Sequence, residues 1–424
     1  MTAFPAPLPL TLAAAGPIDS GSTAWMLASS ALVLLMIPGL SLFYGGMVRQ
    51  KNILSTMMYS FVAMAVIGVQ WIVIGYALAF GTSVGGWIGW NPALIGLVGL
   101  PHDQLFADKA IPELVFVMFQ GKFAIITPAL ISGAIAERVR LSSFIAFIIL
   151  WTTCVYCPLA HWVWASEGWL FKWGVLDFAG GTVVHISSGV SALVLALMLG
   201  KRRDYPAGAI QPNNLTMTLT GAGLLWFGWF GFNAGSAVGF ESPVAGTIAG
   251  LAFTTTQTAA AAAALVWMII EWSHHGKPTS LGMASGIVAG LVAITPAAGH
   301  VKPVYAIIIG AVASLVCYCA VRLKSRLGYD DSLDAFGVHG VGGFWGAIAT
   351  GIFCTIPGLS GLITGHATQL FKQLAGASIA AAFAIVGTLL IGGLVAATMG
   401  LRVSDRQERD GLDIAIHGER GYHL

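Results

Sequence analysis

Long apolar stretches recur along the whole chain, and short polar segments separate them. Each stretch is long enough to cross a bilayer as an α-helix, which takes about 17 to 25 residues. The pattern predicts eleven membrane-spanning helices, at residues 23–47, 53–80, 112–136, 142–164, 180–200, 213–238, 245–271, 279–297, 303–322, 336–354 and 373–400. The expected fold class is therefore all-α, a polytopic membrane protein.

Composition supports a chain that lies mostly in lipid. Of 424 residues, 57% are hydrophobic and 9% are charged, whereas an ordinary soluble domain has about 25% charged residues. The net charge of +2 gives no imbalance that would indicate a nucleic-acid partner. Cys154 and Cys157 form a C-x-x-C, but no second Cys or His pair stands at metal-site spacing. We expect no metal, and we interpret the cysteines as packing residues.

The distribution of cationic residues orients the chain in the membrane. Fifteen Lys and Arg residues lie on one set of alternate connecting segments, and only Lys109, Lys172, Lys302 and Lys372 lie on the other. Because basic loops favour the cytoplasm, the N-terminus is predicted outside and the C-terminus inside. The expected location is the cell (cytoplasmic or inner) membrane. The first residues lack a basic signal-peptide start, and whether they are cleaved is left open.

Two similar segments indicate an internal repeat. Leu176-Asp177-Phe178-Ala179-Gly180 leads to His185, and Leu333-Asp334-Ala335-Phe336-Gly337 leads to His339. The chain crosses the membrane five times between the first segment and the second. The two segments therefore enter from opposite faces, as in an inverted-topology repeat with its site near the midplane. The predicted organisation is an extracytoplasmic segment (1–22), two five-helix repeats (23–200 and 201–354), an outer loop with a straddling last helix (355–400) and a cytoplasmic tail (401–424).

The polar residues of these two segments are candidates for function. An ionisable side chain inside a membrane is unfavourable and usually faces the bundle interior or a cavity, so we expect His185 and His339 to be partners. Alternatively, the two histidines only bind carbonyl groups and tie helices together. Asp177 and Asp334 precede glycine-rich helix starts, where a carboxylate can accept backbone N–H groups, so both are predicted helix caps.

Six segments carry a resemblance to a known family: MFQGKFAIITPALISGAIAERVR (118–140), AHWVW (160–164), LDFAGGTVVHISSG (176–189), GWFGFNAGSA (228–237), DAFGVHGVGG (334–343) and GLRVSDRQERDGLDIAIHGERGY (400–422). In order and topology they resemble the Amt/Mep/Rh ammonium transporter family, and Trp164 resembles its Amt branch, which includes the bacterial AmtB-like members. The resemblance implies eleven helices in two inverted halves plus a straddling last helix. It also implies a homotrimer with one pore per subunit, no cofactor and no enzymatic activity.

Carried over by motif, the outer site that recruits ammonium would be Phe119, Trp164 and Ser236. Aromatic faces attract a small cation, and a hydroxyl oxygen can accept an N–H that potassium does not have. Composition alone would favour a membrane-interface role for Trp164 and core packing for Phe119. The motif match favours recruitment. Lys122 lies beside this site in sequence, and we expect its ammonium group to point away, paired or snorkelling.

Deeper in the pore, the resemblance implies that Phe123 and Phe232 stack as a gate. His185 and His339 would line a narrow apolar passage behind it. Dehydrating an intact ammonium ion there is unfavourable, so deprotonation and conduction of ammonia are expected, with or without separate proton transfer along the histidines. Gln120 and Trp229 would border these residues and support them, and Asp177 and Asp334 would have structural roles.

The tail from Leu401 is rich in charge, which by default indicates a solvated end. Its resemblance to the family instead implies packing on the cytoplasmic face, with regulation and a PII-type partner protein. Three function classes stay open: a transporter, which we favour, with gas conduction of the Rh type as a variant; a sensor that uses the same site; and a membrane enzyme. The lack of a P-loop and of H-E-x-x-H counts against an ATP-driven pump and a zinc enzyme.

Overall fold

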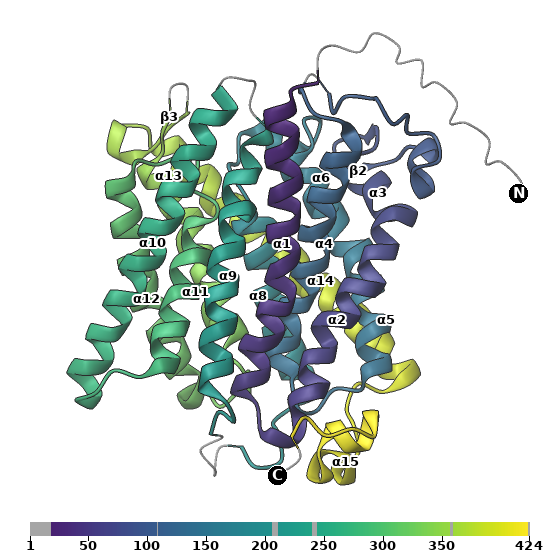
Figure 1. The fold of residues 1–424 in the computed structure, drawn as a ribbon, viewed down its shortest axis with the longest axis vertical. Helices are drawn as coiled ribbons and strands as arrows, with labels where there is room; N and C mark the ends of the chain where they lie inside the picture. The colour runs from purple at the N-terminus through teal and green to yellow at the C-terminus, as the bar shows by residue number, and fades with distance from the viewer. Residues whose placement is uncertain (1–17, 108, 206–210, 240–243, 357–358, 423–424) are drawn as a thin grey trace, which may run out of the picture.

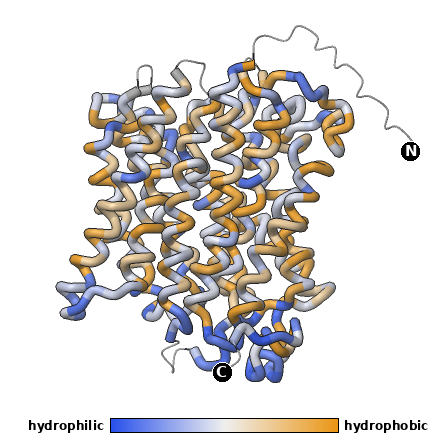
Figure 2. The backbone as a smooth tube through the Cα atoms, viewed as in Figure 1, coloured by the Kyte–Doolittle hydropathy of each residue, from blue (hydrophilic) through white to orange (hydrophobic). Residues whose placement is uncertain are grey.

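The fold is a bundle of long helices that run side by side (Figure 1). The computed structural model describes residues 18–107, 109–205, 211–239, 244–356 and 359–422. Hydrophobic residues dominate the middle of the bundle, and hydrophilic residues gather most densely at the end where the C-terminus lies (Figure 2). This distribution matches a protein whose middle part is surrounded by lipid and whose two ends are in water.

Helices make up most of the described chain. In the first predicted repeat they are α1 (Ser20–Met47), α2 (Ile53–Gln70), α3 (Tyr76–Phe80), α4 (Glu113–Ile135), α5 (Leu141–Trp151), α6 (Cys157–Trp164), α7 (Trp169–Trp173) and α8 (Ser187–Leu199). In the second they are α9 (Leu215–Gly235), α10 (Val244–His275), α11 (Ser280–Ile294), α12 (Pro303–Leu327) and α13 (Val341–Phe353). They are followed by α14 (Ala367–Met399) and α15 (Asp405–Asp410). The all-α fold class is confirmed.

The number of membrane-crossing helices differs from the prediction. Ten helical stretches of the described residues are at least 18 residues long and apolar enough to cross a membrane. At the predicted span 279–297, α11 has only 15 residues. Pro296 has no N–H to continue the helix, and the chain turns there in a buried segment. The count of eleven is therefore not confirmed by length, although α11 occupies the predicted position.

Four π-helical segments interrupt or begin the spans. Trp71–Gly75 joins α2 to α3, and Thr152–Tyr156 joins α5 to α6. Gly181–Ile186 leads into α8, and Phe336–Gly340 leads into α13. Single π-helical turns occur often at functional sites. The last two segments contain the two predicted histidines.

The remaining regular elements are short. Two antiparallel pairs of strands lie in connecting loops, β1 (Ser83–Val84) with β2 (Ile88–Gly89) and β3 (Thr355–Ile356) with β4 (Leu359–Ser360). Four 3₁₀ turns and one further π-helical segment complete the regular structure of the described residues: Gln50–Asn52, Pro92–Leu97, Ser236–Gly239, Leu362–Thr364 and Asp413–His417. Ser236, a predicted site residue, is the first residue of its 3₁₀ turn.

Close helix packing brings the two predicted repeats together. The most extensive contact between two elements is that of α1 with α9, where Gly221 lies directly against the backbone of Phe43. Without a side chain at that position, the two backbones can approach closely. In addition, α8 packs on Phe336–Gly340, and α13 packs on Gly181–Ile186. The two π-helical segments therefore meet at the centre of the bundle.

A buried ion network joins segments at the end of the bundle that holds the C-terminus. Glu137 is fully buried and bonds Arg49 at 3.0 Å and Arg202 at 2.9 Å. Arg202 also pairs with Asp330 at 2.8 Å. Since the exposed fractions of the Arg202 and Asp330 side chains are 4% and 0%, these charges depend on one another. The network ties the loops after α1, α4, α8 and α12.

The tail packs on this network. Glu408 of α15 accepts a bond from Arg402 at 2.7 Å and from the backbone N–H of Arg203 at 2.8 Å. The Asp413 carboxylate accepts the backbone N–H groups of Leu54 and Ser55 at 3.0 and 2.8 Å, at the start of α2. The described part of the tail is therefore ordered against the bundle. The packing implied by the family resemblance is confirmed, and the default expectation of a solvated end is wrong.

Replacing Glu137 tests the ion network. In Glu137→Gln the side chain keeps its shape, but Arg49 and Arg202 lose their shared carboxylate. Removing one partner of a buried ion pair typically destabilises a protein by about 3 to 5 kcal/mol, so we expect a clearly lower melting temperature in detergent. The control is Glu167→Gln, which breaks the exposed pair of Glu167 and Lys172 and should change the melting temperature little.

The same variant should change the acid sensitivity of the protein. Burial by itself would raise the pKa of Glu137, but Arg202 and Arg49 outweigh it and lower the pKa from 4.5 to about 2. A carboxyl with a lowered pKa stabilises the folded state above its unfolded pKa. The contribution is therefore complete above about pH 4.5 and is lost as pH falls towards 2. An equally steep acid loss of melting temperature in Glu137→Gln would contradict this assignment.

Candidate functional site

Asp177 caps the first of two helix starts that lie inside the bundle. Its carboxylate accepts four backbone N–H groups at 2.6 to 3.0 Å, those of Gly180, Gly181, Thr182 and Val183. Gly180 has a φ of 114°, which glycine adopts without strain. The first N–H groups of a helix have no partner within the helix. The capping role predicted for Asp177 is therefore confirmed.

Asp331, rather than Asp334, caps the second helix start. The Asp331 carboxylate accepts the backbone N–H groups of Ala335 at 3.0 Å and Phe336 at 2.8 Å. Asp334 instead forms an ion pair with Lys324 and has a positive φ of 62°. The cap predicted at Asp334 is therefore wrong, because its carboxylate is used in a bond to a side chain.

The number of residues from each capping aspartate to its histidine would have identified Asp331 from the sequence. Eight residues separate Asp177 from His185, and eight separate Asp331 from His339. Asp334 is only five residues from His339, and the shared Leu-Asp dipeptide drew attention to it. Equal distances from cap to histidine would have identified Asp331, since each π-helical segment needs its cap at the same place.

The two histidines form a buried pair. Nδ1 of His185 lies 3.2 Å from Nδ1 of His339, and the rings are nearly parallel, with centroids 5.3 Å apart and planes 17° apart. Their exposed fractions are 1% and 4%. Trp229 stacks on His185 at 5.4 Å and donates through Nε1 to Thr295 Oγ1 at 2.8 Å. The structure therefore brings together three predicted residues from both repeats.

The hydrogen bond between the rings constrains their protons. Of two neutral imidazoles joined through Nδ1, one must donate its N–H and the other must accept it. The donor ring then has an acceptor at Nε2, and the acceptor ring has a donor at Nε2. Within the described residues, Nε2 of His185 is buried and has no hydrogen-bond partner. One ring nitrogen of the pair is therefore not used in any hydrogen bond among the described residues.

A narrow cavity of about 10 Å³ lies against this pair. It has room for about one water molecule. Its walls include both histidines and Trp229, and otherwise consist of apolar side chains: Met36, Leu40, Phe43, Ile126, Leu130, Val184, Leu225, Phe232 and Val288. An ion would have to enter almost without water here, whereas a small neutral molecule meets no such barrier.

Two stacked phenylalanines separate this cavity from the outside. The rings of Phe123 and Phe232 lie 4.1 Å apart between centroids with planes 27° apart. Phe123 comes from α4 and Phe232 from α9, so the stack joins the two predicted repeats. Their exposed fractions are 1% and 0%.

A larger cavity of about 390 Å³ lies on the other side of the stack. Trp164, Ser236, Phe123, Gln120 and Asp177 line it, as do eleven residues that are mostly apolar: Phe80, Phe106, Phe116, Val163, Phe171, Gly174, Val175, Leu176, Phe178, Val238 and His300. Five predicted site residues therefore line the same cavity. Sequence reasoning missed His300, for which no motif or spacing gave a signal.

Hydrogen bonds fix the side chains of Trp164 and Ser236 in this cavity. Trp164 Nε1 donates to the backbone oxygen of Asp177 at 2.9 Å, and its ring meets Phe123 edge-on at 5.9 Å. Ser236 Oγ donates to the oxygen of Phe232 at 2.8 Å. Because the hydroxyl proton is used, the oxygen lone pairs of Ser236 stay available to a ligand. Gln120 Oε1 is buried without a partner in the described part of the chain.

Phe119 does not line the cavity. It is fully buried, its ring meets Phe123 edge-on at 4.9 Å, and it fits beside Gly235, where a side chain would collide with it. Its role in recruitment therefore stays a prediction. Phe119 supports Phe123 from behind, because α4 turns this ring towards α9.

Lys122 lines neither cavity. Its exposed fraction is 8%. The prediction that its ammonium group points away from the recruitment site agrees with this placement. Of the two expected arrangements, paired or snorkelling, the paired one is not found, because no ion pair or hydrogen bond of Lys122 exists among the described residues.

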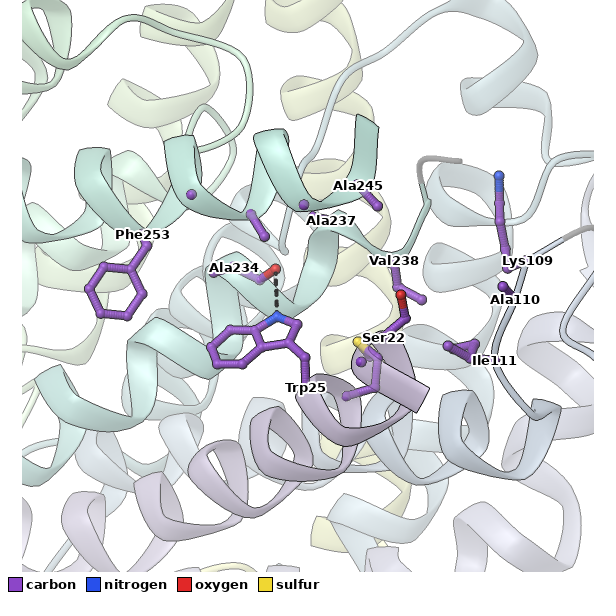
Figure 3. A pocket seen from close by; sticks show the side chains of 15 residues that line it. Ser22, Trp25, Lys109, Ala110, Ile111, Ala234, Ala237, Val238, Ala245 and Phe253 are labelled. Atoms are coloured by element: carbon purple, nitrogen blue, oxygen red, sulfur yellow. Dashed lines mark hydrogen bonds between the residues drawn. The ribbon is translucent and has the colours of Figure 1, made fainter. Parts of the chain in front are cut away.

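A separate hollow of about 640 Å³ lies between α1, α9 and α10 (Figure 3). Trp25 crosses it and donates through Nε1 to Ala234 O at 3.4 Å. Its wall is mostly apolar, with Phe253 on one side and Lys109 at the edge. None of the predicted site residues lines it. We therefore assign the functional site to the two cavities that the phenylalanine stack separates.

Comparison with known proteins identifies the family of the chain. The model of the Ammonium Transporter Family matches residues 24–422. This chain belongs to the ammonium transporter family. The ammonium transporter of Bacillus subtilis is 48% identical over 412 residues, which are 96% of this chain and 99% of that protein. Ammonium transporter Amt1 of Archaeoglobus fulgidus is 46% identical and covers 96% of this chain and 100% of its own length.

Solved structures extend the likeness to the fold. Mep2 of Saccharomyces cerevisiae superposes with a TM-score of 0.85 at 39% identity and covers 92% of this chain and 89% of its own. A structure described as a sensor Amt protein has a TM-score of 0.85 at 30% identity and covers 93% and 98% of the two chains. The chain is therefore an ammonium transporter family member that spans a membrane many times, and the family consists of transporters, not enzymes.

The corrected cap can be tested directly. Asp331→Asn removes the charge that holds two N–H groups inside the bundle, whereas Asp334→Asn removes a charge from a partly exposed ion pair. In Asp331→Asn an NH₂ group replaces one of the two accepting oxygens, so one N–H loses its partner, which destabilises by about 1 to 3 kcal/mol; an exposed pair contributes less than about 1 kcal/mol. We expect the larger fall in melting temperature for Asp331→Asn. The reverse order would restore Asp334 as the cap.

Proposed function

We propose that this chain recruits ammonium in the outer cavity, removes its proton near the phenylalanine stack and conducts ammonia past His185 and His339. The observation that carries the proposal is the buried histidine pair, with an uncommitted Nε2, beside a cavity of about 10 Å³. A histidine pair that served packing alone would need no such adjoining space.

Recruitment follows from the chemistry of the outer cavity. The Trp164 ring offers a face to a small cation, and such contacts contribute about 0.5 to 2 kcal/mol depending on desolvation. Ser236 Oγ and Gln120 Oε1 offer acceptors that are not used within the described chain. Ammonium donates N–H groups to such oxygens and potassium does not. The cavity therefore favours ammonium over an ion of similar size.

Deprotonation follows from the difference between the two cavities. On the outer side, aromatic faces and oxygen acceptors replace part of the hydration of the ion. On the inner side, the space admits about one small molecule, and apolar side chains form most of the wall. Because an unpaired charge in such surroundings is highly unfavourable, the neutral form crosses. The stacked rings of Phe123 and Phe232 must separate briefly for it to pass.

The proton has a route through the histidine pair. If His185 Nε2 accepts a proton from the outer side, its Nδ1–H can pass to His339, whose Nε2–H is then released on the inner side. Each step breaks one N–H bond and forms another, so protons are conserved. Transport by this route moves one charge together with each ammonia molecule.

Three further proposals rest on the family resemblance. They are assembly as a homotrimer with one pore per subunit, location in the cell membrane, and regulation by a PII-type protein at the cytoplasmic face. The ordered tail supports the last, since Asp413 and Glu408 attach it to the starts of α2 and of the loop after α8. A partner that moves the tail would therefore act on the ends of two spans.

Replacing Trp164 tests recruitment. Trp164→Leu removes the aromatic face, so the ammonium concentration for half-maximal uptake should rise about 2- to 30-fold and potassium should compete better. The control is Trp162→Leu, because Trp162 packs among Trp87, Trp169 and Phe383 and does not line the outer cavity. Unchanged competition by potassium in Trp164→Leu would reduce Trp164 to an interface residue.

Replacing the histidine pair tests conduction. We expect His185→Leu combined with His339→Leu to abolish ammonium-dependent current in lipid vesicles, and His185→Asp or His339→Asp to alter selectivity. If the histidines only tied helices together, each change would lower stability by about 1 kcal/mol and leave current intact. The control is His161→Gln, at a buried histidine whose ring bonds Ser83 and Ala79 outside both cavities.

Uptake and current should be recorded together with the melting temperature of each variant. Wild-type current in a folded double variant would rule out the proton route. No uptake by the wild-type protein, with ammonium still raising its melting temperature, would favour a sensor, the function named for one structural neighbour.

A further inference from the structure

His300 is a buried histidine that the mechanism above does not use. It lies in the turn between α11 and α12, and its exposed fraction is 5%. Its backbone is fixed, since its N–H donates to Ala297 O at 2.7 Å and its oxygen accepts from Thr355 N at 3.1 Å. The ring meets Phe178 edge-on, with centroids 5.3 Å apart and planes 83° apart. The position of the imidazole is therefore defined.

The ring nitrogens of His300 have no protein partner in the described ranges of the chain. Nδ1 is buried and unbonded, and Nε2 forms no hydrogen bond either. His161 is the comparison within the same molecule, because both of its ring nitrogens are bonded, to Ser83 Oγ at 2.8 Å and Ala79 O at 2.9 Å. A buried polar group without a partner is destabilising, so His300 needs an explanation that His161 does not.

The location of His300 supplies one. It lines the outer cavity together with Trp164, Ser236 and Gln120. Asp177 shares this wall, but its two oxygens already accept four backbone N–H groups. Among the residues that line the cavity, Ser236 Oγ keeps its lone pairs, Gln120 Oε1 and the His300 ring have no partner in the described chain, and Trp164 offers an aromatic face. Ammonium has four N–H groups to donate.

Its protonation state fits an acceptor. Burial lowers the pKa of His300 to about 4, so the ring is neutral at neutral pH and has one nitrogen with a free lone pair. A neutral ring also adds no positive charge that would repel an ammonium ion. Asp177 is the other titratable group on the cavity wall among the described residues.

We propose that His300 is a further ammonium-binding group of the outer cavity, whose neutral imidazole accepts an N–H of the ion before it reaches the Phe123–Phe232 stack. This inference rests on the proposed recruitment function. It makes the outer site more selective, because potassium has no N–H to give to the imidazole. His300 would act on binding of the ion and not on its passage through the inner cavity.

Two substitutions separate the acceptor from the shape of the ring. His300→Phe keeps an aromatic ring and removes the acceptor, and His300→Gln keeps an acceptor. In lipid vesicles we expect His300→Phe to raise the ammonium concentration for half-maximal uptake about 3- to 10-fold and to strengthen competition by potassium, with little change in maximal rate. His300→Gln should stay within about twofold of wild type. The control His161→Gln should lower the melting temperature and leave half-maximal uptake unchanged.

A measurement on the wild-type protein is independent of how well His300→Phe folds. With ¹⁵N-labelled histidine, the ring resonance missing from His300→Gln identifies His300, and it should shift with ammonium chloride but not with potassium chloride. The inference is overturned if this resonance ignores ammonium, or if folded His300→Phe matches wild type in half-maximal uptake and potassium competition. Either result leaves the proposed function standing so long as wild-type protein takes up ammonium; absence of that uptake contradicts both.

Discussion

The structure depends on how two helices begin inside a membrane. Backbone N–H groups at a helix start have no partner within the helix, and lipid offers none. The carboxylates of Asp177 and Asp331 supply those partners. Because the helix starts can then be buried, the π-helical segments that follow them meet at the bundle centre, and their histidines come within 3.2 Å. The histidine pair is thus a consequence of two caps.

The stack of Phe123 and Phe232 lies between two cavities that differ in polarity. On its outer side, the cavity of about 390 Å³ offers an indole face, a hydroxyl and unpaired acceptors. On its inner side, the space of about 10 Å³ is mostly apolar, and imidazole nitrogens are among its few polar groups. A cation is stabilised in the first and destabilised in the second. The proposed loss of the proton is therefore assigned to Phe123 and Phe232, which line the inner ends of the two cavities on either side of the stack.

A carboxylate also caps a helix start at the end of the bundle. Asp413 of the tail accepts the N–H groups of Leu54 and Ser55 at the start of α2, much as Asp177 does at the start of its π-helical segment. Nearby, Arg202 holds Glu137 and Asp330 in one buried network. A displacement of the tail would leave a helix start uncapped beside this network. The tail is therefore structurally coupled to the ends of several spans.

The sequence by itself determined the class of fold, the positions of the apolar helices and the family, because apolar length and local motifs are properties of neighbouring positions. It predicted the histidine pair and the cap at Asp177. The tertiary structure decided what depends on contacts between distant segments: α11 ends early at Pro296, Phe119 packs behind Phe123, Asp331 replaces Asp334, and His300 enters the outer cavity. No local pattern records which way a ring turns or which carboxylate reaches a helix start.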